Sequence, residues 1–172
     1  INEFYTLNSV SIILIASCCI FIRYNFSKVK KLFVGDAVSL FLGFWISTFL
    51  VTYITSAPSS LIVEQFSIKL ENIPVIAISL ISVPVIDTLR VMLVRIINKS
   101  SPFNADNNHL HHILLNSGFS HLRTSLSLTF INFFIVISIF LLEPYFNSVK
   151  LTIIYILISI FWLAYFEYLK RK

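Results

Sequence analysis

Charged residues divide the chain into long uncharged runs. Five such runs follow one another: 7–22, 37–63, 73–86, 124–142 and 151–166. A helix needs about 20 predominantly apolar residues to cross the hydrocarbon layer of a bilayer. With flanking residues added or polar ends removed, the pattern predicts five membrane helices: 7–22, 37–56, 73–97, 124–142 and 150–168.

Composition supports the same fold class. Of the 172 residues, 57% are hydrophobic and only 12% are charged, which is more apolar surface than a soluble domain of this size can bury. We therefore expect an all-α integral membrane protein, with residues 1–172 forming one membrane domain and about five transmembrane helices.

The basic residues indicate an orientation and not a nucleic-acid surface. They lie at the ends of the apolar runs, so the net charge of +5 forms no basic stripe. If the five helices alternate, Lys69 and Lys150 fall on one side of the membrane and the other 11 of the 13 basic residues fall on the opposite side. The positive-inside rule then places the polar segment 98–121 and the C-terminus in the cytosol, in a multi-pass protein of the cytoplasmic membrane.

The polar segment 98–121 contains the most unusual chemistry in the chain. Its sequence SPFNADNNHLHH, at 101–112, holds three of the four histidines within four positions, close to Asp106. In a helix His109 and His112 lie on one face, and in an extended segment His109 and His111 do. Such imidazoles bind phosphate oxygens, or ligate a soft metal with Asp106 or His121, or are simply solvated. These three alternatives remain open from the residues alone.

Two further carboxylates precede this segment. Asp36 follows Gly35 at the expected start of a membrane helix, where it either caps the helix or holds a cation at the membrane surface. Asp87 shares a helical arc of about 140° with Arg90 and Arg95. That polar face contacts lipid headgroups, lines a cleft, or anchors the helix end through its long side chains.

Several motifs together resemble one enzyme family. VGDAVSLFLGF, at 34–44, is similar to the MGDAGSLFLGF-type segment of the polyprenyl-phosphate N-acetylhexosamine-1-phosphate transferases. PVIDT at 84–88, then Arg95 and SPFNADNNHLHHILLNSGFSH at 101–121, resemble that family's PxxDT…R…SPFxADxxHLHHxLLxxGxSH block. The resemblance covers about residues 20–135, and its HLHH form is closest to bacterial N-acetylglucosamine-1-phosphate transferases of surface polysaccharide synthesis.

The resemblance implies a reaction, a cofactor and site residues. In the family a polyprenyl phosphate attacks a UDP-sugar, which for this type is expected to be UDP-N-acetylglucosamine, and UMP leaves. It implies Mg²⁺ held by Asp36, which would be the catalytic residue of this chain. It also implies a substrate-binding set made up of the histidine motif and its neighbours: His109, His111, His112, Asp87, Arg95 and Asp106.

The chain also departs from the family pattern. Val38 replaces a glycine of the GDAGS motif, and Asn107 stands where a basic residue is common. The family's DDxxD and NxxNxxDGxDG motifs do not occur in these 172 residues. Since the chain starts at Ile1 without a signal-peptide pattern, we expect the C-terminal half of a larger transferase that is inactive without the missing half. A degenerate membrane scaffold and a small metal transporter are the two alternatives.

Overall fold

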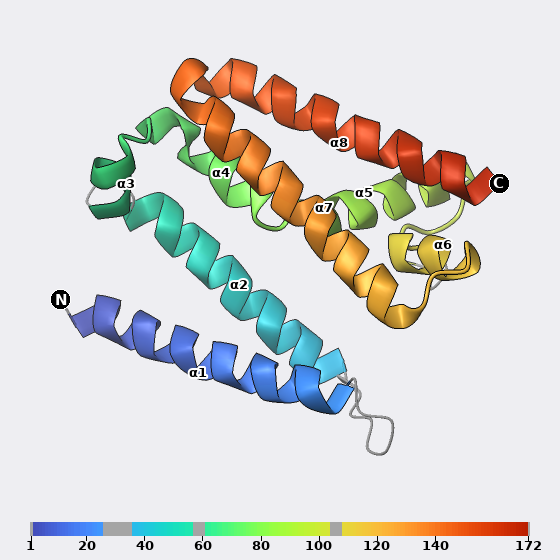
Figure 1. The fold of residues 1–172 in the computed structure, drawn as a ribbon, viewed down its shortest axis with the longest axis horizontal. Coiled ribbons are helices and arrows are strands. Elements are labelled where there is room, and N and C mark those ends of the chain that lie inside the picture. Colours follow the sequence, from blue (N-terminus) through green and yellow to red (C-terminus); the bar gives the residue numbers. More distant parts are fainter. Residues whose placement is uncertain (1, 26–35, 57–60, 104–107, 172) are drawn as a thin grey trace. The chain divides into compact units, whose positions relative to one another are not determined.

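The structure, a computed structural model, describes residues 2–25, 36–56, 61–103 and 108–171. These residues form helices without any strand (Figure 1). In chain order the helices are α1 (Asn2–Asn25), α2 (Asp36–Ser56), α3 (Leu61–Phe66), η2 (Leu70–Asn72), α4 (Ile73–Ser79), α5 (Ser82–Ile97), α6 (Leu110–Asn116), α7 (His121–Leu142), η3 (Glu143–Tyr145) and α8 (Ser148–Arg171).

The expected all-α membrane class is confirmed. Three stretches are long and apolar enough to cross a bilayer: Val38–Ser56, His121–Tyr145 and Ser148–Lys170. The bent pair Leu70–Ser79 and Ser82–Ile97 can make a fourth, and Ser9–Tyr24 of α1 is apolar but shorter. By length and composition the described helices therefore provide three or four crossings where the charge pattern suggested five.

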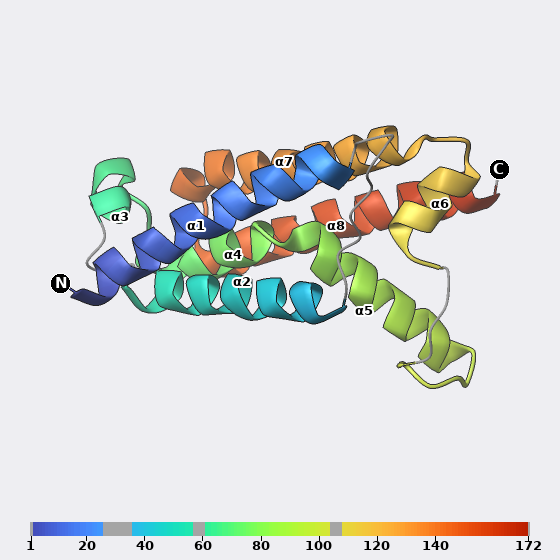
Figure 2. The same ribbon diagram turned by 90° about the horizontal axis from the view of Figure 1, so that it is seen from below.

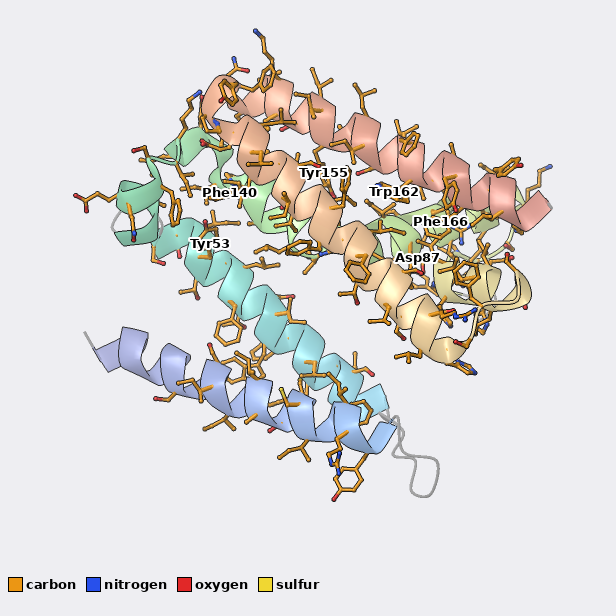
Figure 3. All side chains as sticks on the ribbon, viewed as in Figure 1. Tyr53, Asp87, Phe140, Tyr155, Trp162 and Phe166 are labelled. Carbon is orange, nitrogen blue, oxygen red and sulfur yellow. The ribbon has the colours of Figure 1, made fainter. Side chains whose placement is uncertain are left out.

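The chain divides into two compact units, 1–46 and 47–172, and the second contains the segment with the histidines. In this second unit α7 is the central helix, because it contacts α4, α5, α6 and α8 (Figures 1 and 2). Ile131, Ile135 and Ile139 recur every four residues and form the buried face of α7. They share a core with Tyr155 and Phe166 of α8, two of the side chains labelled in Figure 3.

The opposite face of α7 is apolar as well. Phe130, Phe133 and Phe134 are 68%, 62% and 57% exposed. In water such a face would favour aggregation, whereas in a bilayer it faces hydrocarbon at no cost.

The helix predicted at 73–97 is broken near its first third. α4 ends at Ser79 and α5 begins at Ser82, and the two axes differ in direction by 70°. Asn132 of α7 spans the break, because its Nδ2 donates to Leu80 O at 2.9 Å and its Oδ1 accepts from Val83 N at 3.0 Å. One amide thus satisfies a carbonyl at the end of α4 and an N–H at the start of α5, groups that lipid could not satisfy.

A buried polar connection closes the unit where α7 ends. Glu143 is 2% exposed, and its Oε1 accepts from Lys69 N at 2.7 Å and from Asn72 Nδ2 at 3.0 Å. Asn72 is fully buried and also donates to Glu143 O and Phe146 O. These bonds join η2 to η3 across more than 70 residues of sequence.

The segment 98–121, expected to be a loop, contains the short helix α6. Leu110, Ile113 and Leu114 are buried at helical spacing, which explains why this part of a polar segment folds. Gly118 ends the helix with φ +88°, and bonds from Gly118 N to Leu115 O and from Phe119 N to Leu114 O complete the turn. A left-handed residue after a helix favours glycine, and Gly118 supplies it.

Candidate functional site

Asp87 joins α5 to the start of the histidine segment. Its Oδ2 lies 3.0 Å from His109 Nδ1, and its Oδ1 accepts from Leu110 N at 3.0 Å. Leu110 is the first residue of α6, so the carboxylate caps this helix from another element, at the end where a negative charge is favourable. Asp87 is thus a positioning residue for His109 and α6, a more specific role than headgroup contact or anchoring.

The bond to Asp87 also determines how His109 presents its ring. A carboxylate accepts, so Nδ1 carries the hydrogen and donates to Asp87. The other nitrogen, Nε2, is then left as the atom that acts toward a ligand. With 35% of its side chain exposed, His109 retains access to solvent.

Arg90 is the buried cation of the site. It is 6% exposed, its Nη1 lies 3.0 Å from Glu167 Oε1, and its Nη2 lies 3.4 Å from Asp87 Oδ1. Nη2 also donates to the backbone carbonyl of Asn108. One guanidinium therefore connects α5, α8 and the residue that precedes His109.

The imidazoles of the motif cluster on one side of α6. The rings of His109 and His111 are stacked with centroids 6.0 Å apart, and those of His111 and His112 are 4.1 Å apart. Burial lowers the pKa of His111, and the neighbouring His112 and His109 lower it further, while Asp87 has the opposite effect. His111 is therefore neutral at pH 7, able to donate one hydrogen bond and accept another.

The remaining predicted residues are only partly placed. Arg95 Nη1 donates to Pro102 O, which ties α5 to the polar segment but not to the imidazoles. Asp36 is the first residue of α2, and its side chain is outside the description, as is Asp106 entirely. The structure thus brings together Asp87, His109, His111 and His112.

The described residues show how far the site's own side chains could hold a metal ion. Within residues 2–25, 36–56, 61–103 and 108–171, no group of three or more His, Cys, Asp or Glu side chains has the arrangement of a metal site. Asp87, the described carboxylate nearest the histidines, already accepts from Leu110 and Arg90 and contacts His109. These residues do not make up a zinc or magnesium site by themselves.

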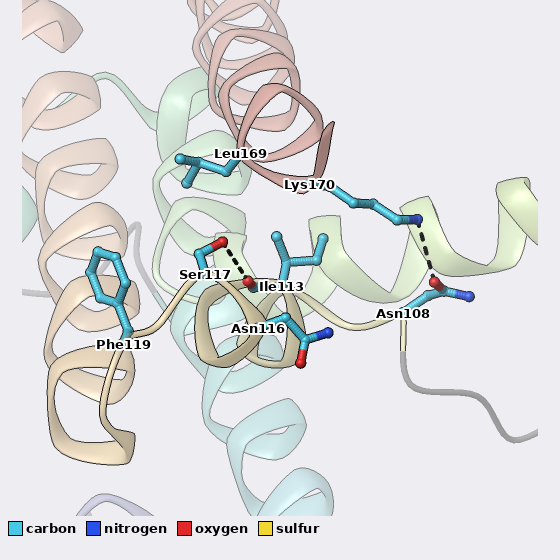
Figure 4. Close-up of a pocket in the computed structure, with 7 residues that line it drawn as sticks. All are labelled: Asn108, Ile113, Asn116, Ser117, Phe119, Leu169 and Lys170. Carbon is cyan, nitrogen blue, oxygen red and sulfur yellow. Dashed lines mark hydrogen bonds between the residues drawn. The ribbon is translucent and has the colours of Figure 1, made fainter. Parts of the chain in front are cut away.

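A cavity of about 550 Å³ lies beside the histidine segment (Figure 4). Asn108, Asn116 and Ser117 provide its polar groups, and Phe119 its aromatic wall. Lys170 of α8 closes one side, with Nζ 3.4 Å from Asn108 Oδ1. The cavity therefore offers amides and a hydroxyl from the segment that carries the histidines, and a cation from α8.

Sequence reasoning missed Asn108 and Glu167 and gave Arg90 no role in the site. Arg90 and Glu167 are 77 positions apart, and neither belongs to a motif. The only sequence signal for Glu167 is that it interrupts an apolar run that predicts a plain membrane helix. Contact between two such residues depends on how α5 and α8 pack.

Comparisons with known proteins agree with the motifs. Residues 2–54 match the family described as "Glycosyl transferase family 4". A probable undecaprenyl-phosphate N-acetylglucosaminyl 1-phosphate transferase of Bacillus subtilis is 37% identical over 150 residues, which is 87% of this chain and 38% of that protein. The undecaprenyl-phosphate alpha-N-acetylglucosaminyl 1-phosphate transferase of Escherichia coli K12 is 30% identical over 80% of this chain and 34% of its own length.

A third relative gives the same result. The decaprenyl-phosphate N-acetylglucosaminephosphotransferase of Mycobacterium leprae is 30% identical over 72% of this chain and 31% of its own length. No solved structure matches the chain significantly. The chain spans about a third of the length of these curated relatives. The family expected from the motifs is confirmed, and the chain belongs to glycosyl transferase family 4, among proteins similar to the polyprenyl-phosphate N-acetylglucosamine-1-phosphate transferases.

Proposed function

We propose that this chain contributes the donor-binding histidine segment of a transferase that moves N-acetylglucosamine 1-phosphate from UDP-N-acetylglucosamine to a polyprenyl phosphate. The observation that carries the proposal is the Asp87–His109 pair, which orients one imidazole and caps the helix that carries the other two. Relatives named as undecaprenyl-phosphate N-acetylglucosaminyl 1-phosphate transferases support the choice of the transferred group and of the acceptor. The product would start a cell-surface polysaccharide.

The chemistry of the proposed donor fits the residues of the site. A diphosphate needs hydrogen-bond donors and positive charge along its oxygens, because phosphoryl transfer depends on positioning and charge neutralisation. His111 and His112 provide N–H donors on α6, and Lys170 provides a cation at the neighbouring cavity. Arg90 is buried and engaged with Glu167 and Asn108, so it supports the segment and leaves the donor to the imidazoles.

The proposed acceptor has a suitable apolar surface nearby. A groove of about 570 Å³ between α5 and α8 is lined almost entirely by aliphatic side chains, with Arg90 and Glu167 among its few polar residues. An isoprenoid chain is apolar along its whole length and can occupy such a groove from the bilayer. Its phosphate would remain at the membrane surface, on the side that the positive-inside rule assigns to the cytosol.

In this proposal Asp36 is the residue of the chain that is assigned to bind Mg²⁺. A carboxylate oxygen at the membrane surface is a ligand type that Mg²⁺ prefers, and the ion would neutralise the diphosphate of the donor. Because the described residues do not complete a magnesium site, further ligands have to come from the substrate or from protein outside them. If Asp36 is a metal ligand, Asp36→Asn in a complete enzyme abolishes Mg²⁺-dependent transfer, whereas a helix cap would tolerate asparagine.

Ring shifts of the histidines test the donor site directly. The full chain in lipid nanodiscs, with ¹⁵N-labelled histidine, is titrated with UDP-N-acetylglucosamine while the imidazole resonances are recorded. We expect the resonances of His111 and His112 to shift until the donor saturates the site, and those of exposed His121 to shift less. Free N-acetylglucosamine, which lacks the diphosphate, is the ligand control and should shift none of them.

Two results would contradict the proposal. If no histidine of α6 responds to the donor, the segment does not bind it and a non-catalytic scaffold becomes the better explanation. If the rings respond to Zn²⁺ in a one-to-one ratio and not to the donor, the histidines form a metal site and the transporter alternative gains support.

A further inference from the structure

We infer that Arg90 and Glu167 form a clamp through which α8 fixes the position of the histidine segment. The clamp consists of Arg90 on α5, Glu167 and Lys170 on α8, and Asn108 between them. None of these side chains has to touch a ligand for the clamp to act, so Arg90 and Glu167 are positioning residues. The consequence for donor binding rests on the proposed function.

The first observation is that two separate bonds from α8 converge on Asn108. Glu167 reaches its backbone carbonyl through the guanidinium of Arg90. Lys170 reaches its side-chain Oδ1 directly, at 3.4 Å (Figure 4). Glu167 and Lys170 are three residues apart and therefore lie on one face of α8, and Asn108 immediately precedes His109.

The second observation is the burial of Arg90. A guanidinium that is 6% exposed is held well only when acids or carbonyls satisfy its charge. Asp87 is 3.4 Å from Arg90, a weaker contact than the 3.0 Å contact with Glu167. Among the described residues the Nε of Arg90 has no hydrogen-bond partner, so the hydrogen bonds of this guanidinium are made by its two terminal nitrogens.

Loss of Glu167 would change the balance at Asp87. Arg90 would keep its charge in a buried position, with Asp87 as the remaining acid near it. Asp87 Oδ1 already accepts from Leu110 N, and Oδ2 contacts His109, so a closer Arg90 competes with both. The cap of α6 and the orientation of His109 therefore depend on a residue of α8 that contacts neither.

Histidine modification in the folded chain tests the clamp. Diethyl pyrocarbonate reacts with accessible unprotonated imidazoles, and mass spectrometry reports each site. We expect Glu167→Gln to raise the modification rate of His109 several-fold relative to that of His121, which serves as internal reference on α7. Glu167→Asp, which keeps the charge, should restore part of the protection.

The matched control is Glu71→Gln, which removes one charge from an exposed glutamate on η2. It should leave the ratio of His109 to His121 modification unchanged. An unchanged ratio in folded Glu167→Gln would overturn the clamp, as would an equal rise in Glu71→Gln. If Glu167→Gln does not fold, Lys170→Gln breaks the exposed contact alone, and the same measurement decides: a rise supports the clamp and an unchanged ratio overturns it.

The clamp and the proposed function fail in different ways. The modification assay needs no substrate, so it reports on the clamp even if the segment binds no nucleotide sugar. Protection of His111 and His112 by UDP-N-acetylglucosamine is then measured separately. A normal clamp without protection contradicts the proposed function only, and protection with an unaltered ratio in Glu167→Gln contradicts the clamp only.

Discussion

At the scale of single residues, the hydrogen bonds of the Asp87 carboxylate hold the site together. Asp87 uses both oxygens on the histidine segment and keeps contact with Arg90. The orientation of His109 thus depends on a residue 22 positions away. A substitution at Asp87 would alter His109 and α6 together, and its effect could not be assigned to one of them.

His111 makes the stability of the folded chain sensitive to pH. Burial lowers its pKa below the ordinary value of 6.5, so the unfolded chain takes up a proton near that pH and the folded chain only at lower pH. His111 therefore does not affect stability above pH 6.5, and it destabilises the fold as the pH falls through 6.5, until the folded form is protonated too. We expect a small effect, because the ring is mostly exposed.

The measurement compares resistance to unfolding by sodium dodecyl sulfate at about pH 7.5 and about pH 5.5, on either side of the ordinary histidine pKa. His111→Gln should lose less stability on acidification than the unmodified chain does. His121→Gln, at an exposed histidine of α7 whose effect on the pKa of His111 is smaller than those of His112, His109 and Asp87, should change the pH dependence less than His111→Gln does. Equal losses in all three chains would show that His111 does not contribute.

The sequence identified the residues of the site but could not predict the contacts between them. Motif resemblance selected Asp87 and the three histidines, and the structure places them together. The bond between Asp87 and His109 could not be derived, because spacing along a helix says nothing about a segment that folds back from residue 109. Arg90 was placed on the polar face of Asp87, but its pairing with Glu167 was not predicted for the same reason, since that pairing depends on tertiary packing alone.

At the scale of helices, the bend between α4 and α5 sets the direction of α5, the helix that carries Asp87. Uncharged runs predicted the long helices well, since lipid requires continuous apolar surface. The break within 73–97 was not predicted, although Pro84 is an interior residue of that expected helix; in the structure it lies in the first turn of α5, where a helix tolerates proline. The apolar pattern continues across the break, so only the bonds of Asn132 reveal it.

Asn132→Leu should weaken this bend. It removes the partners of Leu80 O and Val83 N, and each such group left unsatisfied costs about 1–3 kcal/mol. We expect the midpoint of unfolding by sodium dodecyl sulfate to fall, and Asn132→Gln to restore part of it. Thr129→Leu, at an exposed position one turn earlier on α7, makes a similar polar-to-apolar change and should have little effect. Equal shifts for both leucine variants would exclude a bridging role for the amide.

At the scale of the whole chain, the charge pattern predicts which ends of the helices face the cytosol. The prediction puts Ser117 in the cytosol and Glu64 outside. In a chain with Cys18 and Cys19 replaced by alanine, Glu64→Cys should react with an impermeant maleimide in intact cells. Ser117→Cys should react only after the cells are permeabilised. The reverse pattern would remove the histidine segment from a cytosolic donor and with it the proposed function.

The extent of the chain also determines what activity we expect from it. The 172 residues contain neither DDxxD nor NxxNxxDGxDG, and they span about a third of the named relatives. We expect the purified chain, given Mg²⁺ and a polyprenyl phosphate, to release no UMP from UDP-N-acetylglucosamine. Release of UMP that Asp36→Asn abolishes would show that this expectation is wrong.

The buried connection around Glu143 has a consequence for biogenesis. Glu143 follows Lys69, whose N–H it accepts, by 74 positions. A ribosome that adds about 5–20 residues per second makes Glu143 about 4–15 s after Lys69. During this interval the amide of Asn72 and the N–H of Lys69 have no carboxylate to bind, although both lie against Glu143 in the finished protein. The second unit therefore closes late in translation, since its core also includes Tyr155 and Phe166 of α8, which are made after Glu143.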